Sequence, residues 1–297
     1  MEETDYSQFV PNVHFEQIPI KNLVSNQDYQ RNLSKSHIER AARNFDLYQI
    51  NPVKVSRRDG INYVFNGQHT IEIVAMVSES RDTPVWCMVY DDMDYNIEAD
   101  VFANQQKYVK ALVPYEIYKA NLEAGSDKQI LIKSLVESYG LTIGPGKGQG
   151  VICAVSSLEY IFDTWGFHVL DRTLRLCIGT WEGDANSLSS NMLKGIARLV
   201  VAFDEKMRDD VFKEKVGAYS AKEIVRTAKE RRAGAIGYAE AMLLAYNKKM
   251  KYPLRWSNLF TNQKAKKAVA DIETDIIGAA DEDNENLTFF DDYTIQI

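Results

Sequence analysis

Hydrophobic and polar positions change their spacing about a third of the way along the chain. Before residue 96, short apolar runs bounded by turn residues predict strands at 15–20, 53–56, 61–65 and 85–90. Asp59-Gly60, between the second and third runs, is a typical hairpin turn. Helical spacing predicts one helix capped by Ser34 and another over 70–77. The order β-α-β-β-α-β indicates a small α+β domain with a mixed sheet.

From residue 96 onward, apolar positions recur at helical spacing and predict a mainly α-helical region. The expected helices cover 97–109, 114–123, 127–139, 150–164, 170–180, 187–203, 221–232 and 235–247. We therefore expect four segments: a flexible N-terminus (1–13), an α+β domain (14–110), an α-helical domain (111–270) and an acidic, disordered tail (271–297).

Charge is distributed unevenly over these segments. Residues 1–110 hold 16 acidic and 11 basic side chains, a net charge of −5. Residues 111–270 hold 17 acidic and 24 basic side chains, or +7, and residues 271–297 hold nine acidic and no basic ones, or −9. The middle segment is suited to a polyanion, whereas the tail would repel a polyanion or imitate one.

The remaining composition narrows the class of protein. No apolar run is long enough to span a membrane, and the acidic, polar start is unlike a secretory signal. Cys87, Cys153 and Cys177 lie in apolar runs without metal-ligand spacing, which is typical of reduced core thiols. These features predict a cytoplasmic protein with no bound metal.

The turn Gly67-Gln68-His69-Thr70 is the first candidate site. It joins a predicted strand to a predicted helix, and helix N-termini bind anions through their amides and dipole. Gly67 allows a ligand to approach the backbone closely, while His69 and Thr70 can hydrogen-bond a phosphate. His69 can also act as a general acid or base. A helix cap or a hydrogen-bonded, half-buried histidine explains it equally well.

Several landmarks recur in a characteristic order. Ile20, Leu23, Asn26, Gln30 and Arg31 form a first group, and Pro52 and Val55 end the LYQINPVKV run. The Gly67–Thr70 turn follows, and then Asn104 and Lys107 before a helix led by Pro114. Over residues 14–125 this order resembles the N-terminal domain of ParB-like partition proteins and the ParB/sulfiredoxin superfamily, including uncharacterised ParB-like "nuclease" proteins of bacteria, phages and mobile elements.

The resemblance implies DNA association, homodimer formation and a pocket for a nucleoside triphosphate with Mg. Matched to the family's boxes, that pocket would be formed by Arg31, Gly67, Gln68, His69, Thr70, Asn104 and Lys107.

Three departures from the family pattern argue against its chemistry. His69 and Thr70 replace two arginines, which removes permanent cations from a triphosphate site. Ala103 replaces a glutamate that helps to hold metal in that family. Gln68 stands where sulfiredoxins carry their cysteine, so cysteine-sulfinate reduction is not expected.

Basic residues near the end of the helical region form the second candidate site. Lys222, Arg226 and Lys229 share one helical face. Tyr252 and Trp256 interleave with further cations, as in surfaces that hold phosphates and stack bases. The predicted nucleic-acid contacts are Lys222, Arg226, Lys229, Arg231, Arg232, Lys248 and Lys249. An ordinary solvated helix surface is the alternative.

Three functions remain open at this point. The first is a ParB-like DNA-associated protein, serving a phage or mobile element, with a phosphate or nucleotide site at the Gly67–Thr70 turn. The second is an NTPase or nuclease that uses His69 in the same pocket. The third is a non-catalytic interaction protein, or DNA mimic, that binds a protein partner through its acidic tail.

Overall fold

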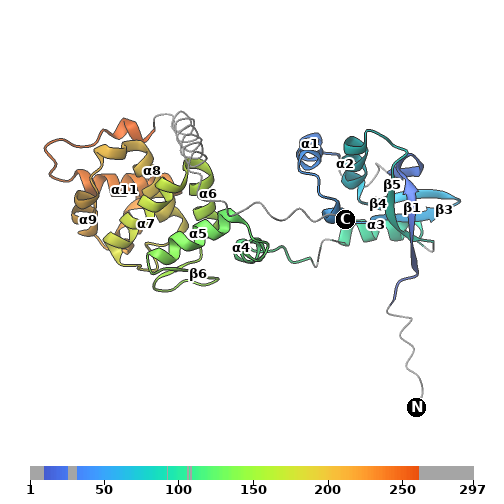
Figure 1. Cartoon of the computed structure of the whole chain (residues 1–297), viewed down its shortest axis with the longest axis horizontal. Helices are drawn as coiled ribbons and strands as arrows, with labels where there is room; N and C mark the ends of the chain where they lie inside the picture. Colours follow the sequence, from blue (N-terminus) through green and yellow to red (C-terminus); the bar gives the residue numbers. More distant parts are fainter. Residues whose placement is uncertain (1–9, 26–31, 92, 106, 108, 261–297) are drawn as a thin grey trace, which may run out of the picture. The chain divides into compact units, whose positions relative to one another are not determined.

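The protein divides into two compact units, Met1–Ala111 and Leu112–Ile297 (Figure 1). The structure is a computed structural model and describes residues 10–25, 32–91, 93–105, 107 and 109–260. The acidic tail predicted for 271–297 and the candidate Arg31 lie outside these described residues. In the described part of the chain, no helix is both long and apolar enough to cross a membrane.

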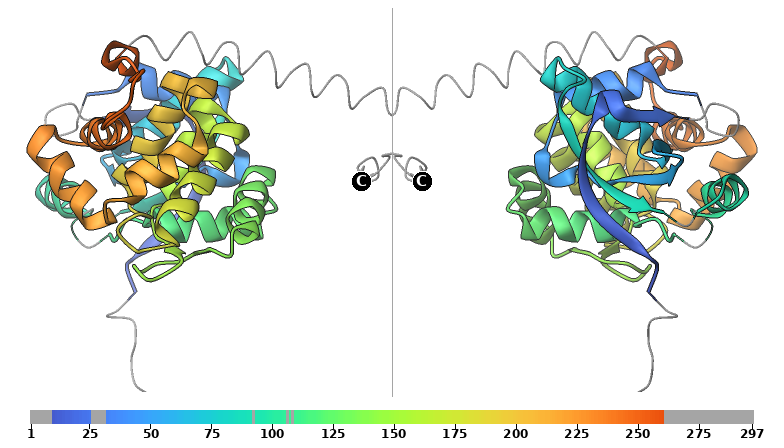
Figure 2. Two further views of the ribbon diagram at one scale, coloured as in Figure 1. Left: turned by 90° about the vertical axis from the view of Figure 1, so that its left-hand side faces the viewer. Right: turned by 90° about the vertical axis from the view of Figure 1, so that its right-hand side faces the viewer.

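The N-terminal unit contains a five-stranded mixed sheet, which Figure 2 shows in its right-hand view. The strands are β1 (Val13–Pro19), β2 (Leu23–Ser25), β3 (Val53–Arg58), β4 (Ile61–Asn66) and β5 (Pro84–Tyr90), in the spatial order β1-β5-β3-β4-β2. β1 and β4 run antiparallel to their neighbours β5 and β3, while the β3–β5 and β2–β4 pairs are parallel. The predicted α+β class with a small mixed sheet is confirmed. β2 was not predicted, because three residues carry too little periodicity.

One face of the sheet forms the core of this unit. α1 (Lys35–Arg43) packs beside α2 (Gln68–Ser78), and Ile71 and Val74 of α2 join the buried valines of β3, β4 and β5. Ser34 caps α1 as predicted, since its hydroxyl accepts a hydrogen bond from the amide of His37. The unit also contains two short 3-10 turns, Ile20–Asn22 and Leu47–Gln49.

The other face carries polar residues that bind α3 (Tyr95–Asn104) to the sheet. Ser56 Oγ donates to the carbonyl of Met93 at 3.0 Å. Arg58 forms an ion pair with Glu98, whose side chain is fully buried, and its guanidinium lies 4.2 Å from the ring centre of Tyr63. A buried carboxylate and its arginine therefore replace apolar contacts at this junction.

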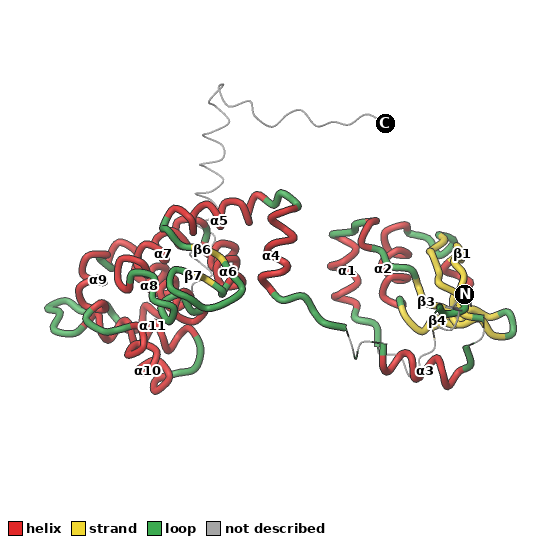
Figure 3. The backbone as a smooth tube through the Cα atoms, turned by 90° about the horizontal axis from the view of Figure 1, so that it is seen from below, coloured by secondary structure: helices red, strands yellow, loops and turns green. Residues whose placement is uncertain are grey.

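The second unit is mainly helical, as predicted, and contains most of the helices in Figure 3. Its helices are α4 (Pro114–Glu123), α5 (Asp127–Ser138), α6 (Val155–Trp165), α7 (Phe167–Trp181), α8 (Ser190–Phe203), α9 (Asp209–Gly217), α10 (Ala221–Arg231) and α11 (Ala235–Asn247), with 3-10 turns at Asp204–Lys206 and Trp256–Leu259. Two two-residue strands, β6 (Thr142–Ile143) and β7 (Val151–Ile152), pair in parallel between α5 and α6. The predicted apolar stripe of 188–203 forms the centre of the core, since Met192, Leu193 and Ile196 are fully buried.

Two features of this unit differ from the prediction. α9 was missed, because 209–217 is short and mostly polar and contributes only Phe212 and Val216 to the core. The helix predicted over 150–164 begins five residues later, at Val155, because 150–152 pair with 142–144 instead.

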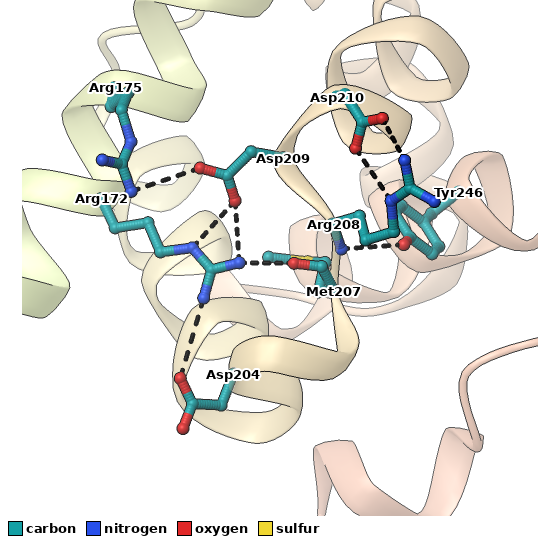
Figure 4. A network of polar contacts seen from close by, with 8 residues as sticks. All are labelled: Arg172, Arg175, Asp204, Met207, Arg208, Asp209, Asp210 and Tyr246. Carbon is teal, nitrogen blue, oxygen red and sulfur yellow. Dashed lines mark hydrogen bonds and ion pairs between the residues drawn. The ribbon is translucent and has the colours of Figure 1, made fainter.

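A network of polar contacts joins α7 to the start of α9 and the residues just before it (Figure 4). Arg172 donates to Asp209 Oδ1 through Nε at 2.9 Å and through a terminal nitrogen at 2.8 Å, and it also donates to the carbonyl of Met207. Arg175 approaches the other oxygen of Asp209 at 3.3 Å. The Arg172 side chain is only 16% exposed, so this is a half-buried charge cluster rather than a surface pair.

Candidate functional site

The turn from β4 into α2 requires glycine at position 67. Gly67 has a φ of +103°, in the left-handed region that side chains disfavour. A Cβ at this position would also lie 3.2 Å from the Cα of Val53 on β3. Both the backbone angle and the space therefore disfavour a larger residue, which would strain the turn.

α2 begins at Gln68, two residues before the predicted start. Its first helical hydrogen bond runs from the amide of Ile71 to the carbonyl of Gly67. Gln68, His69 and Thr70 thus form the first turn of α2, ahead of its first intrahelical hydrogen bond. Gly67 has no side chain to cap these groups. The predicted phosphate turn is therefore a helix N-terminus with its positive dipole end at His69.

The N-terminus of α1 meets this turn. The amide of Ser34 donates to Nε2 of His69 at 3.3 Å, across 35 residues of sequence. The ring of His37 stands edge-on to the ring of His69, with 5.4 Å between their centres. Two helix N-termini therefore converge on one pair of imidazoles. Sequence reasoning predicted the Ser34 cap but assigned no role to His37, because no local pattern links it to residue 69.

A groove of about 530 Å³ lies between α1 and the later turns of α2. Leu33, Lys35 and Ile38 line its α1 side, and Ala75 and Met76 line its α2 side. Glu72 and Arg81, which pair at 2.6 Å, are also part of its wall. The groove has an apolar floor and charged rims, which suits an organic ligand with a charged end.

The end of α3 lies at the same turn. Asn66, which precedes Gly67, donates from its side chain to Oε1 of Gln105 at 2.5 Å. This contact brings the predicted residue Asn104 near the turn, although its amide donates back to Asp100 in its own helix. Lys107 is exposed, two residues after Gln105. Of the predicted cofactor residues, Gly67, Gln68, His69 and Thr70 thus form one turn, while Asn104 and Lys107 lie at the adjoining end of α3.

The predicted basic surface is organised by α10. Lys222, Arg226 and Lys229 are exposed along this helix, as their spacing predicted. Arg231 and Arg232 lie 3.4 and 3.7 Å from the carboxylate of Glu240, which is only 5% exposed. Their charge is therefore partly neutralised within the fold. Of the other predicted contacts, Lys248 donates to the hydroxyl of Tyr219 at 2.6 Å and Lys249 is exposed.

The cysteines are poor nucleophiles where they are buried. Burial raises the pKa of the Cys177 thiol to about 12 and that of Cys87 to about 11, so both remain protonated at neutral pH. Cys153 is half-buried, unlike the core thiol that its apolar run predicted. Among the described residues, no three His, Cys, Asp or Glu side chains gather as a metal site would require.

Comparison with known proteins places the chain in a family. A family model matches residues 24–254, which cover strands β3 to β5, the Gly67–Thr70 turn and helices α1 to α11. The chain belongs to the DUF6551 family, a family of unknown function. No curated protein matches this DUF6551 chain.

One similar solved structure is the C-terminally truncated chromosome-partitioning protein ParB from Caulobacter crescentus, complexed with CTP-gamma-S. It is 14% identical, with a TM-score of 0.33, and the match covers 77% of this chain and 99% of that one. A TM-score this low transfers neither ligand nor partner, so a function for the DUF6551 chain depends on its own geometry.

Proposed function

We propose that the N-terminal unit binds a phosphate-bearing ligand of the nucleotide type where α1 and α2 begin. The observation that carries this proposal is the hydrogen bond from the Ser34 amide to His69 Nε2, which holds two helix N-termini together. Each N-terminus contributes a partial positive charge, and together the two favour an anion more than either would alone.

The same hydrogen bond defines the role of His69. Because a backbone amide can only donate, Nε2 of His69 acts as the acceptor, and the neutral ring carries its proton on Nδ1. His69 therefore links α1 to α2, and its Nε2 is occupied as an acceptor rather than available as a base. This geometry favours ligand binding over the NTPase and nuclease alternatives.

Thermal unfolding with a panel of nucleoside triphosphates and magnesium tests this site. We expect one of them to raise the melting temperature, because a ligand at a hundred times its Kd contributes about 2.7 kcal/mol. His69→Ala should abolish the shift by separating the two helix N-termini. His168→Ala is the matched control, since His168 is exposed at the start of α7 in the other unit. An unchanged shift in His69→Ala, or no shift with any nucleotide, would refute the site.

We propose further that the helical unit associates with DNA through the exposed face of α10. Lys222 and Lys229 are exposed and form no ion pair with any described residue, and Arg226 lies between them on the same face. Unneutralised cations at helical spacing can follow a phosphate backbone and release its counterions on binding.

A salt titration of DNA binding by fluorescence anisotropy tests this second site. Changing Lys222, Arg226 and Lys229 together to glutamine should weaken binding. The plot of log K against log salt should become less steep by about 2.7, because each of the three phosphate contacts contributes about 0.9 to its slope. The control changes Lys119, Lys133 and Lys206 to glutamine, which removes the same charge from exposed positions elsewhere in the unit. Equal losses in both variants would show a net-charge effect and contradict a defined site.

A further inference from the structure

The segment that follows α11 is a closed loop rather than a loose connection. The side-chain amide of Asn247 donates to the carbonyl of Leu254 at 2.9 Å, and its oxygen accepts from the amide of Leu254 at 2.8 Å. This double hydrogen bond joins the two ends of residues 248–253. The loop therefore presents its side chains from a fixed base, which lowers the entropy lost when a ligand orders them.

Burial divides the loop into two sides. Met250 and Leu254 pack against the helical core. Lys248, Lys249 and Lys251 are exposed, and Tyr252 is 78% exposed. A tyrosine so exposed contributes little to folding, but its ring face is available for stacking.

Cations accompany aromatic rings throughout this region. Lys248 lies 5.2 Å from the ring centre of Tyr219, and Lys251 lies 5.4 Å from that of Tyr252. Arg231 and Arg232 lie 5.0 and 5.5 Å from the rings of Trp256 and Phe260. Such pairs occur about once per 70–80 residues in ordinary structures, so four in this region are a concentration. The arginine pairs are balanced by Glu240, whereas the lysine pairs of the loop have no carboxylate partner among the described residues.

The loop segment also lies alongside α10, which Figure 3 labels beside α11. Lys248 contacts Tyr219, which immediately precedes the Ser220 cap of α10. Eight residues later, Trp256 contacts Arg231 at the last turn of α10. Side-chain contacts from Lys248 and Trp256 therefore reach both ends of α10. The loop that carries Tyr252 therefore adjoins the helix that carries the exposed cations Lys222, Arg226 and Lys229.

We infer that this region binds single-stranded nucleic acid, with a base stacked on Tyr252 and the backbone held by the loop lysines and the α10 cations. The inference deepens the proposed DNA association and rests on it. A duplex keeps its bases stacked on one another and presents its phosphates to the protein. Its bases therefore cannot stack on an exposed side chain. A single strand exposes its base faces, and stacking on an aromatic side chain stabilises the complex whatever the base sequence.

The test compares an oligothymidylate with a blunt duplex of the same length by fluorescence anisotropy, at one salt concentration and with the full chain. Tyr252→Ala should weaken single-strand binding about tenfold and leave duplex binding unchanged, whereas Tyr252→Phe should bind the single strand like the wild type. Tyr48→Ala is the matched control, because Tyr48 is 98% exposed in the other unit. Both tyrosines are so exposed that their loss should leave the melting temperature unchanged.

Two results would overturn the inference. One is a Tyr252→Ala variant that binds the single strand like the wild type, and the other is equal weakening on single strand and duplex. A failure of the underlying DNA association has a different signature: wild-type protein would bind neither oligonucleotide, or the triple glutamine variant of α10 would bind both unchanged. If the triple variant loses binding while Tyr252→Ala binds the single strand like the wild type, DNA association is retained and base stacking is rejected.

Discussion

Arg58→Met should destabilise the N-terminal unit by about 3 kcal/mol, because it removes the arginine that pairs with the buried carboxylate of Glu98. Glu98 is fully buried on α3, and Arg58 approaches it from β3 while stacking over Tyr63. Desolvating a charge costs several kcal/mol unless an opposite charge compensates for it. The loss should therefore exceed that of an ordinary surface ion pair.

Native-state hydrogen exchange on peptides from β3 to β5 measures this effect within one unit of the full chain. A loss of about 3 kcal/mol corresponds to exchange about a hundredfold faster, at 1.36 kcal/mol per decade. Arg57→Met is the matched control: its partner Glu16 is 44% exposed, so the loss should stay below about 1 kcal/mol. Adding Glu98→Gln to Arg58→Met should recover much of the stability, since no buried charge remains. Equal effects for Arg57 and Arg58 would contradict this account.

Arg172→Met should destabilise the helical unit by about 2–3 kcal/mol. Arg172 bridges Asp209 and the carbonyl of Met207, so its removal leaves a half-buried carboxylate and a backbone acceptor without their main donor (Figure 4). Arg175 still reaches Asp209 at 3.3 Å, which limits the loss. Lysine should not restore stability, because a single ammonium cannot reproduce the guanidinium's two directions of donation.

Urea unfolding followed by tryptophan fluorescence tests this prediction, since Trp165 and Trp181 are both buried in the helical unit. Arg208→Met is the control. Arg208 pairs with Asp210 at 2.5 Å, yet both side chains are about 70% exposed, so the unfolding midpoint should not change. A midpoint that falls equally in both variants would show that the half-buried network is no stronger than a surface pair.

Local signals in the sequence were enough to predict the order of elements. Alternating apolar runs identified β1, β3, β4 and β5, and helical spacing identified most of the helices, because these patterns reflect burial within each segment. The predicted cap of α1 by Ser34 was confirmed, and Gly67 lies in a strand-to-helix turn as predicted, with a left-handed backbone. The α9 helix was missed because its few apolar positions give no local period.

By itself, then, the sequence determined a mixed sheet followed by helices, a glycine turn at residue 67 and a basic helix face at Lys222, Arg226 and Lys229. Each of these follows from residues within one or two turns of one another. Only the tertiary structure decided that the start of α1 meets His69, or that Arg231 and Arg232 balance Glu240. These contacts join residues brought together by packing, and no periodicity along the chain records which distant partner a charge or an imidazole will find.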